Sequence, residues 1–450
     1  MLDILQTIIA FIVAIGILVA VHEWGHFWVA RRCGVKVLRF SIGFGPTLWS
    51  RTDKLGTEYV IAAIPLGGYV KMLDERVEEV SATDLPFAFN QQVVWKKIAI
   101  IAAGPLVNFI FAVFALYVMF LIGVPTSKAM LGEVVPDSIV SQSSITSHAT
   151  ITGVGERQTR NWEEVNLELM SYIGQDAIAI TWQPEGQQFI KTTNLDIKEW
   201  KFDPDKTSAV SSLGFSVYRP DIILVLAQVV KNSAAEQIGL QVGDKILQFD
   251  GTTMQNWEQI VGYVTERPKQ PIVIKVERDG QILALNGLIG EKTDKGITRG
   301  YMGFLPTLEA WPEGVLFDYQ YGVVDGVAKA LDKTWRLMTV SVGMLGKLIT
   351  GDISVKNLSG PIAIAQGAGM SASSGLVYFL GFLALISVNL GIINLLPLPV
   401  LDGGHLLYYF IELVSGRPVP ESVQEVGFKI GGVILLLLMS IAIVNDITRL

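Results

Sequence analysis

The sequence predicts a polytopic α-helical membrane protein with four transmembrane helices and a large inserted region of mostly β structure. Half of the 450 residues are hydrophobic, only 17% are charged, and the mean hydropathy is +0.44, whereas about a quarter of a soluble domain is charged. Four long apolar stretches supply the helices, and a duplicated segment between the second and third stretches supplies two small domains. The net charge of −7 gives no electrostatic reason to expect a nucleic-acid partner, so the lipid bilayer is the predicted surrounding.

The four predicted spans cover residues 1–30, 98–124, 375–402 and 428–446. A span needs roughly 20 residues. The last one has only 16 uncharged residues between Lys429 and Asp446, so we expect Lys429 to act as a snorkelling end. The first stretch could also be a cleaved signal peptide, but it opens with MLDILQ, without a basic region, and no small-residue cleavage site follows.

The charges between the spans predict the orientation of the chain. The connection at 31–97 is rich in positive charge, with Arg31 and Arg32 at its start and Lys97 at its end, and such connections stay in the cytoplasm. The region 125–374 and both termini then face outside, and the connection at 403–427 faces the cytoplasm. His22 and Asp402 therefore lie near the inner ends of two spans, at the same predicted depth.

The motif HEWGH at 22–26 predicts a zinc site in the first span. Positions i and i+4 share one face of a helix, so His22 and His26 can bind one zinc ion, and Glu23 can act as general base. A glutamate between two histidines is costly to bury in a membrane, and such residues are functional by default. Two structural histidines on an apolar helix are the alternative. The single cysteine, Cys33, rules out an internal disulfide and a cysteine-built metal site.

Asp402 is the predicted third ligand, because a catalytic zinc takes three protein ligands. It lies in NLLPLPVLDGGH at 394–405, where Pro397 and Pro399 each break a helix. Irregular backbone at membrane depth is tolerated only where it lines a cavity or is buried in protein, so this segment is predicted to line the site. A helix-end acid without a metal is the alternative for Asp402, and His405 is a second candidate ligand.

Further polar groups in the spans are candidates for substrate binding. Asn389 and Asn394, in the third span, could each hydrogen-bond the unwound backbone of a substrate. Hydrogen bonds between the helices of the bundle are the alternative for both residues, and Asn108 in the second span has the same two interpretations.

The segment EYVIAAIPLGGYVKM at 58–72 predicts a membrane-associated β-hairpin at about 56–75, with a turn at Gly67 and Gly68. It is too hydrophobic for a free cytoplasmic connection. A strand edge beside the zinc could hold an unwound substrate in extended form, which makes Ala62, Ile64, Gly67 and Gly68 candidate substrate contacts. A hairpin that only packs on the cytoplasmic edge is the alternative.

The outer region contains an internal repeat. VVPDS at 134–138 matches VVKNS at 229–233, and NWEEV at 161–165 matches NWEQI at 256–260, which indicates a tandem duplication. The second copy, NSAAEQIGLQVGDKILQFDG, resembles the PDZ pattern, so PDZ domains are expected at 125–220 and 221–310. Such domains bind extended peptides or serve as spacers and steric filters. The tails SLGF and YMGF resemble PDZ carboxylate-binding loops, formed here by Leu213, Gly214, Phe215, Met302, Gly303 and Phe304.

The remaining outer segment, 311–374, is a predicted linker with an amphipathic helix at about 331–350. Its apolar face would comprise Leu331, Trp335, Met338, Val342, Leu345 and Ile349. A helix on the outer membrane surface is one interpretation, and a helix packed on a domain is the other.

HEWGH in the first span, a PDZ-type repeat and NLLPLPVLDGG in the third span together resemble the site-2 protease family over nearly the whole chain. The resemblance implies one zinc ion per chain, held by His22, His26 and Asp402, with Glu23 as base. It also implies the inner membrane of a Gram-negative cell, with the PDZ domains in the periplasm and the active site near the cytoplasm. The implied substrate is a transmembrane anti-sigma factor already cut outside, with remnant signal peptides as a second class.

The predicted activity is therefore that of an intramembrane zinc metalloendopeptidase. Two other classes of protein are the alternatives. A membrane PDZ scaffold or chaperone would need the repeat but not HEWGH, and would survive the loss of Glu23. A zinc transporter would need polar residues across the whole membrane, whereas these cluster at one depth.

Overall fold

The computed structural model of the protein describes residues 2–202, 207–294 and 297–449. It divides into two compact units: residues 1–216 together with 317–450, and residues 217–316. The first unit holds four helices that are long and apolar enough to cross a membrane, together with the first β domain. The second unit is formed around the second copy of the repeat.

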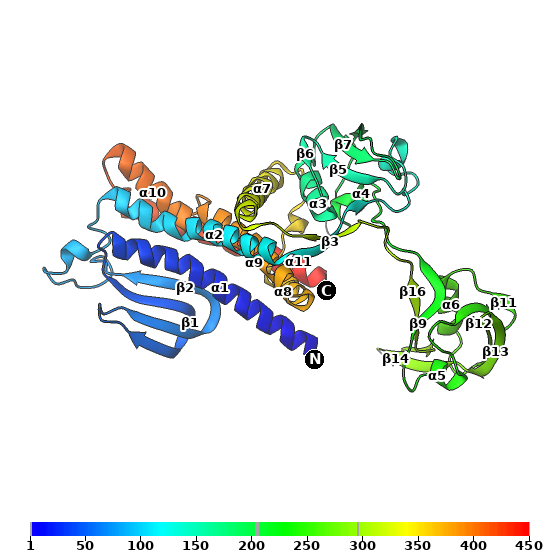
Figure 1. Ribbon diagram of the computed structural model, residues 1–450. Helices are drawn as coiled ribbons and strands as arrows, with labels where there is room; N and C mark the ends of the chain where they lie inside the picture. Colours follow the sequence, from blue (N-terminus) through cyan, green and yellow to red (C-terminus); the bar gives the residue numbers. More distant parts are fainter. Residues whose placement is uncertain (1, 203–206, 295–296, 450) are drawn as a thin grey trace. The chain divides into compact units, whose positions relative to one another are not determined.

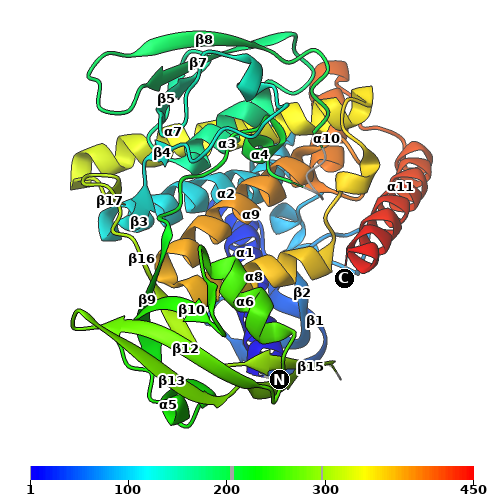
Figure 2. The same ribbon diagram turned by 90° about the vertical axis from the view of Figure 1, so that its right-hand side faces the viewer.

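The four apolar helices are α1 (Leu2–Arg32), α2 (Val94–Ile122), α9 (Leu376–Leu395) and α11 (Glu421–Thr448). α2 packs along both α1 and α9, as Figure 1 shows. Small residues permit the close approach: a β-carbon on Gly25 of α1 would come within 2.5 Å of the backbone oxygen of Ala103 in α2. α11 is the least enclosed of the four, and Figure 2 shows it at the edge of this unit.

The predicted third span differs in detail from the structure. α9 ends at Leu395, and the backbone from 396 to 401 is irregular, because the rings of Pro397 and Pro399 prevent a regular helix. Asp402 then begins α10 (Asp402–Ser415), which occupies half of the connection expected at 403–427. α11 begins earlier than the predicted 428, so the fourth helix is not short.

Strands β1 (Val37–Thr52) and β2 (Glu58–Met72) form one antiparallel sheet between α1 and α2 in the sequence. Ile42 pairs with both Ile61 and Gly68, so β2 runs on both sides of the first half of β1. The two halves of β2 run in opposite directions, because residues 58–61 and 68–71 pair with residues 39–42 in opposite order. The chain therefore reverses just before Gly68, close to the predicted turn, and a further reversal lies at residues 53–57. Several large apolar side chains of the sheet are exposed, namely Phe44, Leu48, Trp49, Ile61 and Ile64.

The first β domain contains a sheet of order β4-β5-β7-β8, with β6 paired to β5. Its helices and strands are β4 (Ala129–Met130), η2 (Val140–Gln142), β5 (Thr150–Val154), β6 (Arg157–Gln158), α3 (Trp162–Ser171), β7 (Ala177–Gln183), β8 (Lys191–Asp196) and α4 (Ala209–Ser212). Trp182, Leu169 and Phe215 are among its fully buried side chains. Outside this sheet, β3 (Val124–Ser127) pairs with β17 (Leu316–Tyr319).

The second unit contains a sheet of order β13-β12-β10-β9-β16, with β11 paired to β10, and a separate pair β14-β15. Its elements are β9 (Ile222–Val229), α5 (Ala234–Ile238), β10 (Lys245–Phe249), β11 (Thr252–Thr253), α6 (Trp257–Thr265), β12 (Pro271–Arg278), β13 (Gln281–Leu288), β14 (Gly290–Asp294), β15 (Ile297–Tyr301) and β16 (Phe304–Leu308). The two copies share their helix caps: Asn161 accepts from the Glu164 N–H at α3, and Asn256 accepts from the Gln259 N–H at α6.

The predicted amphipathic helix is α7 (Val323–Thr350), which starts before the expected residue 331. One face packs on α2, α3 and α9, while Leu331, Trp335, Val342 and Ile349 remain exposed. The helix therefore packs on protein and also presents an open apolar stripe. α7 is followed by η3 (Val355–Asn357) and α8 (Pro361–Ser374); the remaining short helix, η1 (Leu85–Phe87), lies before α2.

Ion pairs join α7 to α3 of the first β domain. Lys329 lies 2.9 Å from Glu164, Lys333 lies 2.8 Å from Glu163, and Arg336 forms two hydrogen bonds with Glu168. The basic side chains of α7 thus dock the first β domain on the helix that packs against α2 and α9.

Candidate metal centre

The two histidines of HEWGH face each other on α1. One helical turn separates them, so their side chains share a face, and their Nε2 atoms lie 3.3 Å apart. Both side chains are buried, and the two rings meet edge to face with centroids 4.9 Å apart. Two imidazoles are thereby aimed at one point.

Asp402, the first residue of α10, completes a triangle with the two histidines. Its Oδ2 lies 3.2 Å from Nε2 of His22 and 3.3 Å from Nε2 of His26. The following glycines make this approach possible. A β-carbon on Gly403 would come within 2.2 Å of the Leu396 oxygen, and one on Gly404 within 2.3 Å of the Pro399 Cα. The irregular segment can fold back onto the start of α10 only because both positions lack a side chain.

The triangle fits a zinc ion. Tetrahedral zinc with bonds of about 2.0 Å to nitrogen and oxygen places neighbouring ligand atoms about 3.3 Å apart, close to the three spacings observed here. Oδ2 of Asp402 is buried and has no hydrogen-bond partner among the described residues. Three lone-pair donors that converge in this way repel one another unless a cation lies between them. Across residues 2–202, 207–294 and 297–449, no other group of His, Cys, Asp and Glu has this geometry.

Helix α2 supports both imidazoles from behind. The backbone oxygen of Ile100 lies 2.8 Å from Nδ1 of His26, and the amide of Asn108 lies 3.0 Å from Nδ1 of His22. Between these two positions, a β-carbon on Gly104 would come within 2.3 Å of Nε2 of His26. Sequence reasoning missed Ile100 and Gly104, because a backbone carbonyl and a glycine carry no chemical signature. For Asn108 it left two roles open, and the contact with His22 of α1 matches the helix–helix alternative without its partner having been named.

The sheet reaches Glu23 at Gly68. A β-carbon on Gly68 would come within 2.9 Å of Cγ of Glu23 and within 2.8 Å of Cγ1 of Val19. The second half of β2, residues 68–72, therefore lies against α1 at Gly68, beside the ligand triangle. The other candidate contacts of the hairpin lie within the sheet: Ala62 pairs with Thr47, and Ile64 pairs with Phe44.

Gly67, the fourth candidate contact of the hairpin, faces Phe44. Its hypothetical β-carbon would come within 2.4 Å of the Phe44 ring. Of the four predicted hairpin contacts, the structure thus places Gly68 directly against Glu23.

The candidates on the third span have different surroundings. Oδ1 of Asn389 accepts a hydrogen bond of 2.8 Å from the Ser341 hydroxyl of α7, which matches the helix–helix alternative. Asn394 is half-buried in the last turn of α9, and Pro397 is exposed just beyond it. Pro399 packs on α11, where a β-carbon on Gly431 would come within 3.0 Å of its ring.

His405 lies outside the ligand triangle. Its ring packs on the ring of Phe428 in α11, with centroids 5.2 Å apart. The distances place His22, His26 and Asp402 together as one set of donors, and His405 belongs to the contact between α10 and α11.

The two candidate carboxylate loops differ in their backbone hydrogen bonds. In the first copy, the N–H groups of Gly214 and Phe215 donate to the backbone oxygens of Ser211 and Val210, in the turn of α4. Leu213 and Phe215 are buried, as are Met302 and Phe304 of the second copy. In that second copy, the carbonyls of Met302 and Gly303 accept from Ala235 and Val230.

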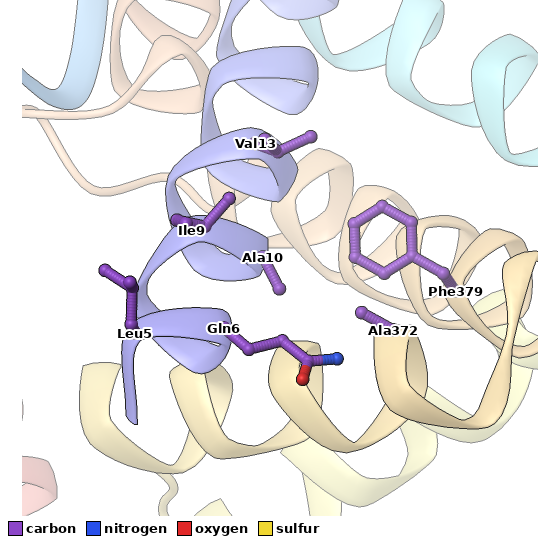
Figure 3. A pocket seen from close by; sticks show the side chains of 7 residues that line it. All are labelled: Leu5, Gln6, Ile9, Ala10, Val13, Ala372 and Phe379. Atoms are coloured by element: carbon purple, nitrogen blue, oxygen red, sulfur yellow. The ribbon is translucent and has the colours of Figure 1, made fainter. Parts of the chain in front are cut away.

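An apolar groove of about 440 Å³ lies between the start of α1 and the helices α8 and α9 (Figure 3). At 1.5 Å per residue, Ile9 in this groove is about 20 Å along α1 from His22, so the groove is separate from the triangle. It is lined by Leu5, Gln6, Ile9, Ala10, Val13, Ala372 and Phe379.

The chain is similar to several known proteins over its full length. The sequence profile of peptidase family M50 matches residues 10–438. A putative zinc metalloprotease of Vibrio cholerae is 50% identical over 455 residues, and the regulator of sigma-E protease RseP of Salmonella typhimurium is 51% identical over 450 residues. The protein with the same name in Escherichia coli is 50% identical over 450 residues. Each of these alignments covers 100% of both chains.

Proposed function

The chain belongs to peptidase family M50, the zinc-dependent site-2 proteases, and on that premise we propose that it hydrolyses peptide bonds inside the transmembrane segments of other membrane proteins. The chain is thus a zinc metallopeptidase. The proposal rests on one observation: the three donor atoms of His22, His26 and Asp402 lie 3.2–3.3 Å apart, and the two histidines are on α1, a helix long and apolar enough to cross a membrane.

In the proposed mechanism, His22, His26 and Asp402 hold one zinc ion. When bound, zinc supplies a Lewis acid that polarises the scissile carbonyl and makes a water molecule easier to deprotonate. The Glu23 carboxylate takes the proton from the attacking water and then delivers it to the leaving amine. Glu23 follows His22 directly on α1, so its carboxylate is carried by the same turn as the first ligand.

The proposed site lies near the cytoplasmic face of a Gram-negative inner membrane, with the β domains in the periplasm. The last turn of α1 carries Arg31 and Arg32, which fits the rule that positive charge stays inside. Trp24 and Trp28 of the same helix are exposed, and the Arg32 guanidinium lies 4.9 Å from the Trp28 ring. Exposed tryptophans beside arginines are typical of the membrane–water interface.

The proposed substrate is a transmembrane anti-sigma factor that another protease has already cut in the periplasm, with remnant signal peptides as a second class. Support comes from the relatives named regulators of sigma-E protease, which match this chain over its full length. The scissile peptide bond of any such substrate becomes accessible to the active site only when the backbone is unwound, because a helix hides its carbonyl and N–H groups in internal hydrogen bonds.

Strand addition is the proposed means of holding that unwound backbone. The second half of β2, residues 68–72, lies against α1 beside Glu23. An extended peptide can add to the edge of a sheet. The irregular segment 396–401, which follows Asn394 in the last turn of α9, leads directly into Asp402. A substrate strand paired along Gly68 would thus pass the general base on its way to the ligand triangle.

The two β domains are proposed to be PDZ domains with unequal roles. Carboxylate binding in such a domain needs free backbone N–H groups in its loop. In the first copy, the N–H groups of Gly214 and Phe215 are already bonded within the turn of α4. Peptide binding is therefore assigned to the second copy, and the first copy, docked on α7, is assigned the role of a steric filter.

A trapping experiment tests the proposed function. The Glu23→Gln chain is expressed in its native membrane, crosslinked and digested, and the bound peptides are identified. We expect segments from transmembrane regions of single-pass proteins, attached near Gly68 and Asn394. Attachment only to the outer domains, together with full physiological function of the Glu23→Gln chain, would instead indicate a scaffold.

A further inference from the structure

Asn108 of α2 contacts Nδ1 of His22, and metal binding by His22 determines which atom of the Asn108 amide must face that nitrogen. His22 and His26 both turn Nε2 toward Asp402, so Nε2 must keep its lone pair for a metal. A neutral imidazole carries one proton, and in both rings that proton must therefore sit on Nδ1. Each Nδ1 then needs an acceptor, because it is a buried donor.

His26 has such an acceptor in the backbone. The Ile100 oxygen lies 2.8 Å from its Nδ1, and a carbonyl can only accept a hydrogen bond. This contact fixes the tautomer of His26 and leaves Nε2 free.

His22 faces a side-chain amide at the matching place. The amide nitrogen of Asn108 is assigned 3.0 Å from Nδ1, while the amide oxygen has no partner among the described residues. The nitrogen and oxygen of an amide exchange places by a 180° turn and are assigned from their surroundings. Since a protonated Nδ1 cannot pair with an NH2 group, the metal-binding state requires the oxygen of Asn108 at this position.

The geometry of α2 fits this role. Ile100, Gly104 and Asn108 are spaced four residues apart, so they lie along one face of the helix. The first accepts from His26, the second leaves room for both rings, and the third meets His22. Asn108 is itself held in place, because it is fully buried and its backbone oxygen accepts a hydrogen bond of 2.8 Å from Ser387 of α9.

We propose that Asn108 is a positioning residue for the zinc site: its side-chain oxygen accepts the Nδ1 proton of His22 and thereby keeps Nε2 of His22 available to the metal. The inference rests on the proposed ligand set. Outer partners of this kind typically change metal affinity by about 10–100-fold when they are removed.

Zinc affinity of the purified full-length chain tests the proposal. Metal-free wild type, Asn108→Leu and Asn108→Asp are titrated with zinc in competition with a chromogenic chelator. Leucine has a similar size but no acceptor, whereas the aspartate carboxylate can accept the Nδ1 proton. We expect Asn108→Leu to bind zinc about 10–100-fold more weakly and Asn108→Asp to stay within a few-fold of wild type.

Ser341→Ala is the matched control, since it removes a hydrogen bond between two helices, α7 and α9, without touching His22 or Asn108. Its zinc affinity should equal that of wild type. If the Asn108→Leu chain does not fold, Asn108→Ala gives the same comparison without adding a branched side chain. Wild-type affinity in the variants without an acceptor, or equal weakening in Asn108→Asp, would overturn the proposal. The ligand set itself fails separately, if His22→Ala and Asp402→Ala bind zinc as wild type does.

Discussion

Gly68 of β2 lies directly against Glu23 of α1, so that a β-carbon on the glycine would come within 2.9 Å of Cγ of the glutamate. The same hypothetical atom would come within 2.6 Å of the Ser41 backbone oxygen. The backbone of β2 at Gly68 thus packs directly on α1 at Glu23, the proposed general base, with no side chain between them. This contact sets the distance between the strand that would hold a substrate and the carboxylate that would deprotonate the attacking water.

Enlarging Gly68 should therefore reduce catalysis while zinc stays bound. In Gly68→Val, either β2 or α1 must shift, and a displacement of about 1 Å can cost about 100-fold in rate. We expect the kcat of a transmembrane reporter to fall by about that factor, with wild-type zinc content. Gly16→Ala, in open space on the same helix, is the control and should cleave normally. Equal turnover in Gly68→Val and wild type would show that this contact does not position the substrate.

Replacing Glu23 by glutamine should separate metal binding from chemistry. The amide cannot accept the proton of the attacking water, and general base catalysis is worth about 100- to 10,000-fold. Purified Glu23→Gln should hold one zinc ion per chain and should cleave the reporter at least about 100-fold more slowly. Cleavage within a few-fold of wild type would exclude Glu23 as the base.

The contact between Arg336 and Glu168 should hold the first β domain on α7. Nε of Arg336 lies 2.6 Å from Oε1 of Glu168, and both side chains are largely buried. Burial raises the pKa of Glu168 despite the nearby guanidinium. Arg336→Met leaves the carboxyl unpaired, which costs about 3–5 kcal/mol for a buried pair. Hydrogen exchange of residues 162–171 should accelerate accordingly.

Two further variants check this assignment. The double variant Arg336→Met with Glu168→Met removes both charges and should recover most of the protection of α3. Lys429→Ala breaks an exposed pair with Glu425 on α11, worth about 0.3–0.5 kcal/mol, and should leave α3 unchanged. Unaltered exchange of α3 in Arg336→Met would mean that other contacts dock the domain.

Glu164 should make the same docking sensitive to acid. Burial alone would raise its pKa, but hydrogen bonds from Tyr319 and Lys329 outweigh burial and hold the pKa below its ordinary value. A lowered pKa in the folded state contributes stability above the unfolded pKa of about 4.3, and this contribution is lost as the pH falls through the folded value.

The difference between wild type and Glu164→Gln isolates this effect. We expect wild type to protect the amides of α3 better at pH 7, and the advantage to shrink as the pH falls below about 4.3. Exchange rates corrected for the intrinsic effect of pH supply the measurement. An advantage that is constant from pH 7 to pH 3 would assign the stabilisation to something other than the ionised carboxyl.

The residues with distinctive chemistry could be predicted from sequence, whereas their supports could not. HEWGH and LDGG carry ionisable groups in apolar surroundings, and the topology of the spans predicts a common depth for His22 and Asp402. The contacts from Ile100 and Gly104 depend on how α2 packs against α1, and neither residue has a reactive side chain. The spacing of the three donors likewise depends on packing.

The differences between the predicted and the observed fold have a similar cause. A turn was predicted at Gly67 and Gly68, because glycine pairs favour turns, and β2 does reverse just before Gly68. That Gly68 has no room for a side chain against Glu23 and Ser41 depends on packing. The end of α9 at Leu395 follows from Pro397 and Pro399, which sequence alone does indicate. That Asp402 begins a new helix depends on Gly403 and Gly404 meeting the folded-back segment 395–399.

Zinc stoichiometry tests most directly whether one ion is held jointly by α1 and the start of α10. Wild type, His22→Ala and Asp402→Ala are purified in parallel and their metal content is measured by mass spectrometry, with unfolding temperature as the check on folding. We predict one zinc ion per wild-type chain and a folded but nearly zinc-free Asp402→Ala chain. Full zinc occupancy in a folded Asp402→Ala chain would contradict the shared site.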